Sequence, residues 1–296
     1  MNNCKPLLSI ITPVYNRGEL LKTCWESLVR QTDKDFEWIV VDDGSTDGSA
    51  DVVRGLPDAG FPLILVEKEN GGKHTALNAS HPYVRGKYVV ILDSDDYLVD
   101  SAVARIREGW ARYDENENIG IVTFLKGRAE NEPSCAADDE GVPVDIMRYQ
   151  RRCFYSGDCC EVIRTELFLK YPFPVFPGER FLSEGALWNR VSLTHKCVYI
   201  NSVIYIADYL EGGLTKSGKP LRIRNPLGGM YTANLNMHPK NFLKRRIKYG
   251  LLFGCYGCFA GMGPVQMLKR SDNKLLAALT MPAGWMLYLY WKRKYA

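Results

Sequence analysis

The first hundred residues alternate short apolar runs with amphipathic segments. Four runs rich in β-branched residues are typical of buried strands, and they cover residues 7–15, 36–45, 62–69 and 86–96. The segments between them have helical spacing or helix-starting residues, and they predict helices within residues 17–32, 46–56 and 72–84. Strands that alternate with helices predict a parallel sheet covered on both faces.

Polar residues follow three of these predicted strands. The sequence TPVYN ends the first strand, DDGS ends the second, and DSDD ends the fourth. In an open parallel sheet the carboxyl ends of the strands share one edge, and ligands bind beyond it. The three polar clusters therefore predict a ligand site at that edge.

Asp93, Asp95 and Asp96 are crowded at the end of the fourth strand. Closely spaced carboxylates repel one another, and a hard divalent cation relieves the repulsion and also binds phosphate oxygens. The alternative is an ordinary turn with helix-capping aspartates. Asp43, beside Asp42, is suited either to a metal or to the imide N–H of a base such as uracil.

Other side chains near the same edge complete a nucleotide site. The ring of Tyr15 can stack on a flat base, and Lys73 and His74 follow two glycines in a turn that suits a diphosphate. Each segment alone is typical of a turn, but together they indicate a base platform, an imide acceptor, a phosphate contact and a metal.

The remainder of the chain is less regular. Residues 153–174 predict a strand and a helix, and residues 196–210 predict a strand pair or one long bent strand. The tail contains two apolar runs flanked by basic residues, but one is short and the other is interrupted by Pro282 and Gly284, so neither predicts a spanning helix. These helices either pack on the main domain or, as we favour, lie on an anionic membrane surface.

The length of 296 residues suits one large domain with an appendage, and a net charge of +4 gives no indication of nucleic-acid binding. Nine cysteines show no disulfide framework, and no signal peptide precedes the first strand. These features predict a cytoplasmic protein.

The segments SIITPVYNRGELLKTCWESLVRQT, FEWIVVDDGSTDGS, ENGGKHTALN and VVILDSDDYL together resemble family 2 of the inverting glycosyltransferases, which have the GT-A fold. The resemblance is close over residues 6–105, looser to about residue 215, and absent from the last eighty residues. It implies an α/β GT-A domain over residues 1–220, with a mostly parallel, doubly wound sheet and helices on both faces. Within it, residues 5–110 would form the nucleotide-sugar half and residues 111–220 the acceptor half, while residues 221–296 would form a helical, partly apolar appendage.

The resemblance also implies roles for individual residues. Asp43 would accept a hydrogen bond from the base imide, and Lys73 would replace at the diphosphate an arginine that the family commonly has at the position of Leu77. In the DxD motif, Asp93 would lie near the ribose or a metal-bound water and Asp95 on the metal, with Asp96 behind them or near a sugar. The remaining nucleotide contacts would be Thr12, Pro13 and Tyr15 at the base and Ser94 within the motif.

Inverting transfer needs a general base on the acceptor hydroxyl. The family often has this base in a Glu-Asp pair four residues before a tryptophan, and here Glu184 and Trp188 have that spacing, with Ser183 in place of the first acid. A helix start favours the ionised form of Glu184, although a carboxylate there can also merely complement the helix dipole. Glu179 is the nearest rival, and Asp158 and Trp188 are further candidates for contacts with the acceptor or donor sugar.

The resemblance therefore implies a hexosyl- or N-acetylhexosaminyltransferase that uses Mn²⁺ or Mg²⁺ and a nucleotide sugar, preferably UDP-linked. Its acceptor would be a glycan or a lipid-linked molecule in polysaccharide biosynthesis for the cell envelope, and the protein would be peripheral at the inner face of the plasma membrane. A degenerate nucleotide-sugar-binding scaffold is one alternative. A sugar nucleotidyltransferase is disfavoured because residues 12–19 lack a glycine-rich phosphate loop, and a dinucleotide oxidoreductase because no G-x-G-x-x-G follows the first strand.

Overall fold

The computed structural model describes residues 5–147, 152–153, 158–207 and 214–295. The chain divides into two compact units. The first contains residues 1–145, 149–172 and 194–208, and the second contains residues 146–148, 173–193 and 209–296. The second unit therefore includes a segment before residue 194 as well as the C-terminal helices.

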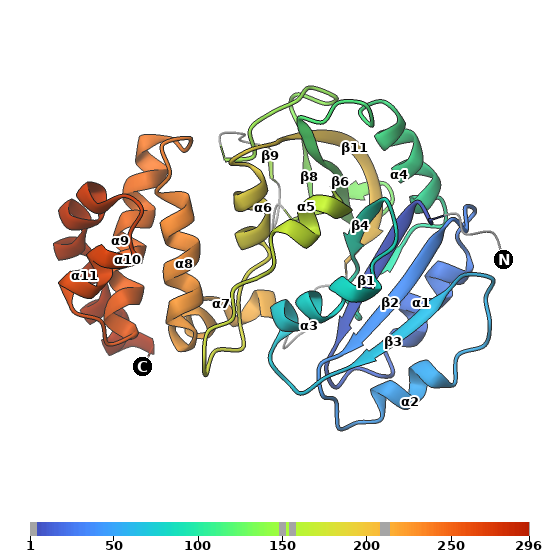
Figure 1. Cartoon of the computed structure of the whole chain (residues 1–296), viewed down its shortest axis with the longest axis horizontal. Coiled ribbons are helices and arrows are strands. Elements are labelled where there is room, and N and C mark those ends of the chain that lie inside the picture. Colours follow the sequence, from blue (N-terminus) through green and yellow to red (C-terminus); the bar gives the residue numbers. More distant parts are fainter. Residues whose placement is uncertain (1–4, 148–151, 154–157, 208–213, 296) are drawn as a thin grey trace. The chain divides into compact units, whose positions relative to one another are not determined.

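The first unit is built on a nine-stranded sheet in the order β3-β2-β1-β4-β10-β6-β11-β5, with β7 paired to β6. The strands β1 to β4, which lie side by side in Figure 1, are parallel to one another, whereas β10 runs antiparallel to both β4 and β6. The strand bounds are β1 Leu8–Val14, β2 Phe36–Asp42, β3 Leu63–Glu67, β4 Tyr88–Ile91, β5 Tyr97–Leu98, β6 Ile119–Ala129, β7 Glu132–Pro133, β10 Cys159–Arg164 and β11 Lys196–Ile206. A separate two-stranded sheet pairs β8 Cys135–Ala136 with β9 Arg152–Cys153.

The strand order contains a topological switch point beside β1. The chain steps from β1 to β2 and β3 in one direction and then returns to place β4 on the other side of β1. Right-handed crossovers put the helices of the two directions on opposite faces of the sheet, and the crevice between them opens beyond the carboxyl ends of β1 and β4. The polar residues after these two strands therefore lie at the position where such sheets bind ligands.

Short helices connect these strands and cover the sheet. In α1, the buried side chains of Leu21, Cys24 and Leu28 recur at helical spacing and turn one face towards the core. The helices of this unit are α1 Leu21–Val29, α2 Ser49–Arg54, α3 Lys73–Ala79, η1 His81–Tyr83, α4 Ala102–Ala111 and α5 Thr165–Lys170. The predicted α/β class with a sheet of GT-A type is confirmed.

Glu37 is a buried charged residue in the core of the first unit. The carboxylate of Glu37 is fully buried, and its oxygens accept hydrogen bonds from Ser9 Oγ at 2.6 Å, Arg85 N at 2.7 Å and Arg85 Nε at 2.7 Å. Close by in the sheet, the ring of Tyr88 stacks on Trp110 with centroids 4.2 Å apart. These contacts fix the amino-terminal end of the parallel strands, away from the polar clusters.

The second unit is helical. Its core joins Phe253 and Tyr256 of α9 to Met230 of α8 and Trp291 of α11, whose ring meets Tyr256 edge-on at 6.0 Å. A Cβ on Gly284 would lie 2.7 Å from Leu251 O, so this glycine allows α9 and α11 to pack closely. The helices are α6 Gly185–Val191, α7 Leu214–Arg224, α8 Pro226–Asn236, α9 Leu243–Phe259, α10 Pro264–Arg270 and α11 Lys274–Tyr295.

These helices confirm the predicted C-terminal helical region. In the described parts of the chain, none of the helices combines the length and the apolar composition needed to cross a bilayer.

Candidate functional site

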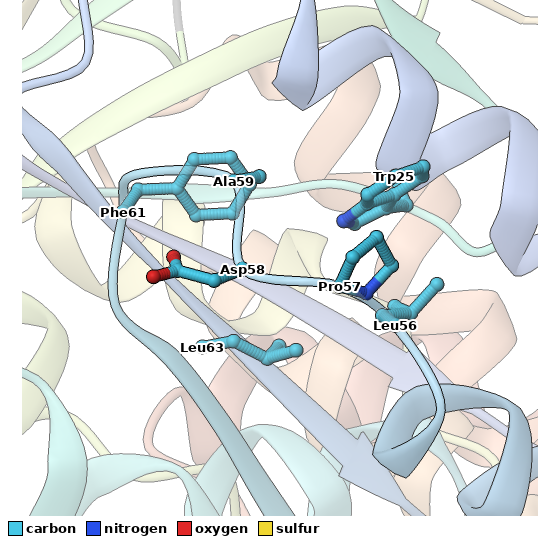
Figure 2. Close-up of a pocket in the computed structure, with 7 residues that line it drawn as sticks. All are labelled: Trp25, Leu56, Pro57, Asp58, Ala59, Phe61 and Leu63. Carbon is cyan, nitrogen blue, oxygen red and sulfur yellow. The ribbon is translucent and has the colours of Figure 1, made fainter.

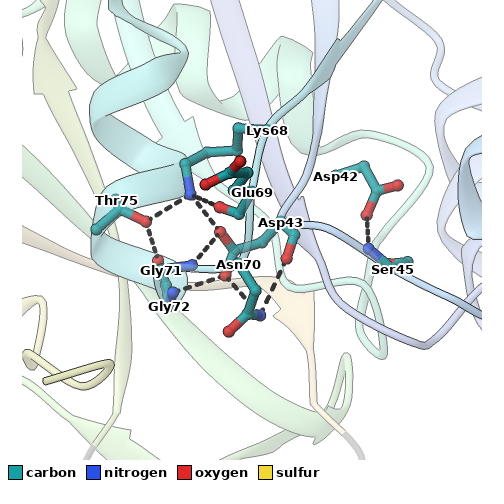
Figure 3. Close-up of polar contacts among 9 residues, drawn as sticks. All are labelled: Asp42, Asp43, Ser45, Lys68, Glu69, Asn70, Gly71, Gly72 and Thr75. Carbon is teal, nitrogen blue, oxygen red and sulfur yellow. Dashed lines mark hydrogen bonds and ion pairs between the residues drawn. The ribbon is translucent and has the colours of Figure 1, made fainter. Parts of the chain in front are cut away.

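Asp43, directly after β2, holds the loop that leads into α3 (Figure 3). One carboxylate oxygen accepts from Lys68 Nζ at 2.6 Å and Gly71 N at 3.0 Å, and the other accepts from Gly72 N at 2.7 Å and Asn70 Nδ2 at 3.3 Å. Each carboxylate oxygen has two acceptor positions, so these four donors fill the group. The side chain is only 4% exposed, and an imide N–H would have to replace one of the four donors.

This network changes the interpretation of the glycine-rich turn. The amide groups of Gly71 and Gly72 point to Asp43, so they are not directed at a diphosphate. His74 is buried, and burial lowers its pKa, which favours the neutral ring and removes it as a phosphate-binding cation. Leu77, at the position of the family arginine, is fully buried in the core. Lys73 is therefore the cation that α3 offers to this edge.

The DSD carboxylates face two cations. Lys73 Nζ pairs with Asp93, and the guanidinium of Arg17, in the loop after β1, pairs with Asp95. Burial opposes ionisation of Asp93, but the charges of Lys73 and Lys126 outweigh it and hold the pKa of Asp93 below its ordinary value. The Arg17–Asp95 pair joins the loops after β1 and β4, which is the switch point of the sheet.

Arg17 is held by a rigid turn. Asn16 adopts a left-handed backbone conformation with φ of 51°, which asparagine tolerates better than most residues. Its N–H donates to Ser45 Oγ at 2.9 Å, and its side-chain oxygen accepts from Thr46 N at 2.8 Å. The N–H of Arg17 donates to Ser49 Oγ at 3.2 Å. The YNR and DDGSTDGS segments are thus one interlocked pair of loops.

Tyr205, on β11, anchors the DSD loop through two hydrogen bonds. Its buried hydroxyl donates to Asp96 Oδ2 at 2.7 Å and accepts from Asp93 N at 3.0 Å. Lys126 Nζ lies 3.9 Å from the centroid of the Tyr205 ring. Burial raises the pKa of Asp96 to about 7, against the opposing effect of the tyrosine hydrogen bond. Asp96 is thus bound to the scaffold, and a contact with a sugar would require it to leave this bond.

Four of the predicted nucleotide contacts, Thr12, Pro13, Tyr15 and Ser94, lie in different environments. Tyr15 is 46% exposed and free to offer its ring. Thr12 is fully buried, and its hydroxyl accepts from Trp38 Nε1 at 2.9 Å, while Pro13 and Ser94 are also buried. Of these four residues, Tyr15 alone presents a side chain to solvent, and the other three support the loops.

The predicted general base, Glu184, and its neighbours belong to the second unit. Glu184 is partly exposed immediately before α6, and its carbonyl oxygen accepts from Leu187 N at 2.8 Å. Trp188 is buried in α6.

Glu179 has a structural position in the same unit. Its carboxylate accepts from Leu227 N at 2.6 Å and Gly228 N at 2.8 Å, and so it caps the start of α8. Both oxygens are engaged, which argues against a sugar contact. Asp158, in the first unit, lies exposed immediately before β10.

Within the described ranges, no group of three His, Cys, Asp or Glu side chains is arranged to hold a metal ion by itself. A cavity of about 260 Å³ near α2 and β3 contains none of the predicted residues, as Figure 2 shows. Its walls are mostly apolar and include Trp25, Phe61 and Leu63, with Asp58 their charged member. The acidic loop edge is therefore the better candidate site.

Four residues of this site were not predicted from the sequence: Arg17, Lys68, Lys126 and Tyr205. Arg17 follows the quoted TPVYN motif directly, and a search for cations beside each acidic cluster would have found it. Lys68 likewise precedes the glycine pair by three residues. Lys126 and Tyr205 carry no local signal, because they reach the site through sheet pairing alone.

Comparisons with known proteins agree with this geometry. Residues 9–142 match the family described as Glycosyl transferase family 2. The chain is 32% identical over 223 residues to glycosyltransferase GlyA of Streptococcus pneumoniae, an alignment that covers 71% of this chain but 31% of GlyA. This chain thus spans less than a third of that relative.

Solved structures show the same fold. TarS (residues 1–349) of S. aureus in complex with UDP-GlcNAc has a TM-score of 0.59 at 18% identity, over 97% of this chain and 91% of that one. The mannosyltransferase PcManGT of Pyrobaculum calidifontis, in complex with GDP-Man and Mn²⁺, has a TM-score of 0.58 at 20% identity, over 97% of this chain and 82% of that one.

Proposed function

Because the chain belongs to glycosyltransferase family 2, we propose that it transfers a sugar from a UDP-linked donor to a hydroxyl of a glycan or lipid-linked acceptor, with inversion. The observation that carries this proposal is the cluster of Arg17, Lys73, Asp93 and Asp95 at the switch point of the sheet. Two cations suit a diphosphate, and the adjacent carboxylates suit a divalent metal. The structures of TarS with UDP-GlcNAc and PcManGT with GDP-Man support a nucleotide-sugar donor.

The donor set at this edge fits Mn²⁺ or Mg²⁺. Asp93 and Asp95 offer hard carboxylate oxygens, and a magnesium-type ion is commonly held by one or two carboxylates together with substrate phosphates. A site of that kind needs no third protein ligand. When bound, the ion would stabilise the negative charge that develops on the departing nucleoside diphosphate.

Each of these residues of the first unit would then have a separate role in donor binding. Tyr15 would stack on the base, and Arg17 and Lys73 would pass from the DSD carboxylates to the diphosphate oxygens. Asp43 would keep the ENGG loop in place and would read the base imide if one of its present donors gave way. Tyr205 and Asp96 would hold the DSD loop still during this exchange.

Glu184 is the proposed general base. It would accept the proton of the acceptor hydroxyl as that oxygen attacks the anomeric carbon from the face opposite the diphosphate. The support for this proposal is its spacing of four residues from Trp188 and its partial exposure immediately before α6. Asp158 remains a candidate for a contact with the acceptor or the donor sugar.

We also propose that the enzyme works at the inner face of the plasma membrane, on a polysaccharide or lipid-linked acceptor of the cell envelope. The support is the basic, apolar character of the C-terminal helices.

The substitution Glu184→Gln tests the catalytic assignment. A general base contributes about 10²- to 10⁴-fold in rate, so the variant should release UDP from the donor in the presence of acceptor at least 100-fold more slowly. Its affinity for UDP should be unchanged. The matched control is Glu132→Gln, on the exposed strand β7, which should retain full activity. Full activity of the Glu184 variant would assign the base to another residue.

A further inference from the structure

The charge of the protein is concentrated in its last helices. Residues 243–296 contain ten lysines and arginines but one acidic residue, Asp272, which gives this segment a formal charge of +9. The whole chain carries only +4, so the rest of the protein is net negative. This asymmetry indicates an anionic partner for the C-terminal helices.

One face of α11 is apolar and open to solvent. The exposed fractions are 73% for Leu275, 72% for Leu279, 60% for Met286 and 57% for Tyr290. These residues recur at helical spacing, on the side opposite the buried Ala277, Thr280, Gly284 and Trp291. In this unit α9 and α10 pack against α11, yet these four side chains stay exposed. A helix that is apolar all round is typically covered on every side.

A cavity of about 570 Å³ lies beside this exposed face. Its walls come from Met262, Met267 and Leu268 on the α10 side and from Met281, Trp285 and Tyr288 on α11. The volume is within the usual range of ligand pockets, and flexible thioethers adapt to irregular apolar ligands. Trp285 is 53% exposed and thus connects the cavity with the outer surface.

Basic side chains flank α11 at both ends. Lys269 and Arg270 end α10, and Lys274 begins α11. At the far end, Lys292 and Lys294 lie 5.7 and 5.9 Å from the ring centroids of Tyr288 and Tyr290. Aromatic rings and lysines around an apolar stripe are the composition of a helix that lies in the interfacial layer of an anionic membrane.

We propose that the exposed face of α11 binds an anionic lipid surface and that the adjacent cavity receives one hydrocarbon chain of a lipid. A second copy of this chain fits the face poorly, because two segments of charge +9 would repel each other. This site adds to the proposed function, because it would hold the enzyme where a lipid-linked acceptor lies. The observations that support it come from the C-terminal helices and do not depend on the sugar transfer.

Vesicle sedimentation tests the surface. The full chain should bind vesicles of phosphatidylglycerol and phosphatidylcholine, less so as salt increases, and should bind pure phosphatidylcholine weakly. Replacing Lys292, Arg293 and Lys294 by Gln should reduce the partition coefficient about a hundredfold, since each basic residue near such a surface contributes about fivefold. The matched control neutralises Lys5, Lys22 and Arg112, which are exposed in the first unit, and should change binding little.

Quenching by lipids brominated on their acyl chains tests the cavity. Trp285 lies in its wall, so bound vesicles should quench a component of the fluorescence that the variant Trp285→Phe lacks. Equal quenching of the two proteins would overturn the hydrocarbon-chain assignment. Failure of the folded protein to bind anionic vesicles at low salt would contradict the proposal that the exposed face of α11 binds lipid. A UDP titration of the same sample reports on the donor site independently.

Discussion

The buried hydroxyl of Tyr205 allows the scaffold of the DSD loop to be tested by removing a single oxygen atom. In the variant Tyr205→Phe, the Asp96 carboxyl loses a donor at 2.7 Å and the N–H of Asp93 loses its acceptor at 3.0 Å. Because the pKa of Asp96 is raised to about 7, its carboxyl is only partly ionised at neutral pH, and the hydrogen bond from Tyr205 contributes about 0.5–3 kcal/mol. An unsatisfied buried N–H costs about 1–3 kcal/mol. Relaxation of the loop recovers part of this, so the free energy of unfolding should fall by about 2–4 kcal/mol.

Urea denaturation measures this change. With a slope of about 2–3 kcal/mol per M, the unfolding midpoint of the first unit should fall by about 1 M. The metal-dependent affinity for UDP should fall about tenfold, because the loop that carries Asp93 and Asp95 would be less well held. A purely structural tyrosine would lower the midpoint without changing the affinity for UDP.

Two further variants make the test specific. Tyr83→Phe removes an exposed tyrosine hydroxyl and should change the unfolding free energy by less than about 0.5 kcal/mol. The double variant Tyr205→Phe with Asp96→Asn should be less destabilised than the sum of its two single variants, because the two side chains share a bond. Additive effects, or an unchanged midpoint in Tyr205→Phe, would show that the Tyr205–Asp96 hydrogen bond does not stabilise the DSD loop.

Three other changes test separate parts of the structure. Glu37→Ala should lower the free energy of unfolding by about 2–4 kcal/mol in urea denaturation, because it leaves the buried donors Ser9 Oγ and Gly86 N without their acceptor; a loss below 1 kcal/mol would contradict this. Gly44→Ala should weaken UDP binding in calorimetry, since Gly44 has φ of 76° and an added Cβ would lie 2.7 Å from Asn70 N; wild-type affinity would show that the two loops are not tightly apposed. Glu179→Ala should destabilise the protein by about 1–2 kcal/mol in thermal denaturation through the lost cap of α8, with UDP affinity unchanged; a loss of UDP affinity would instead give Glu179 a role at the site.

The parallel half of the sheet was predictable because its evidence is local. Each strand from β1 to β4 is a short apolar run, and each is followed by polar residues and a helical pattern. The reversal at β10 and its position between β4 and β6 depend on pairing between distant segments. The segment after residue 196 was expected as a strand pair or a bent strand, and it forms the single strand β11 with shifts of register.

The site was predictable only in part. Acidic residues at strand ends located the edge, and Asp43, Asp93 and Asp95 lie there as expected. The cations that neutralise them were harder to predict, because the direction of Arg17 depends on the left-handed turn at Asn16 and on the loop after β2. The catalytic role of Glu184 remains a prediction from the resemblance.

The central claim is that the edge formed by the DSD loop and the loop after β1 binds a nucleoside diphosphate with a divalent metal. The most direct measurement is calorimetric titration of the protein with UDP, GDP and dTDP, with and without Mn²⁺, together with the variant Asp95→Ala. The expected result is Mn²⁺-dependent binding of UDP by the unaltered protein and its loss in Asp95→Ala. Unchanged Mn²⁺-dependent affinity in Asp95→Ala, or no binding of any nucleotide by the folded protein, would contradict it.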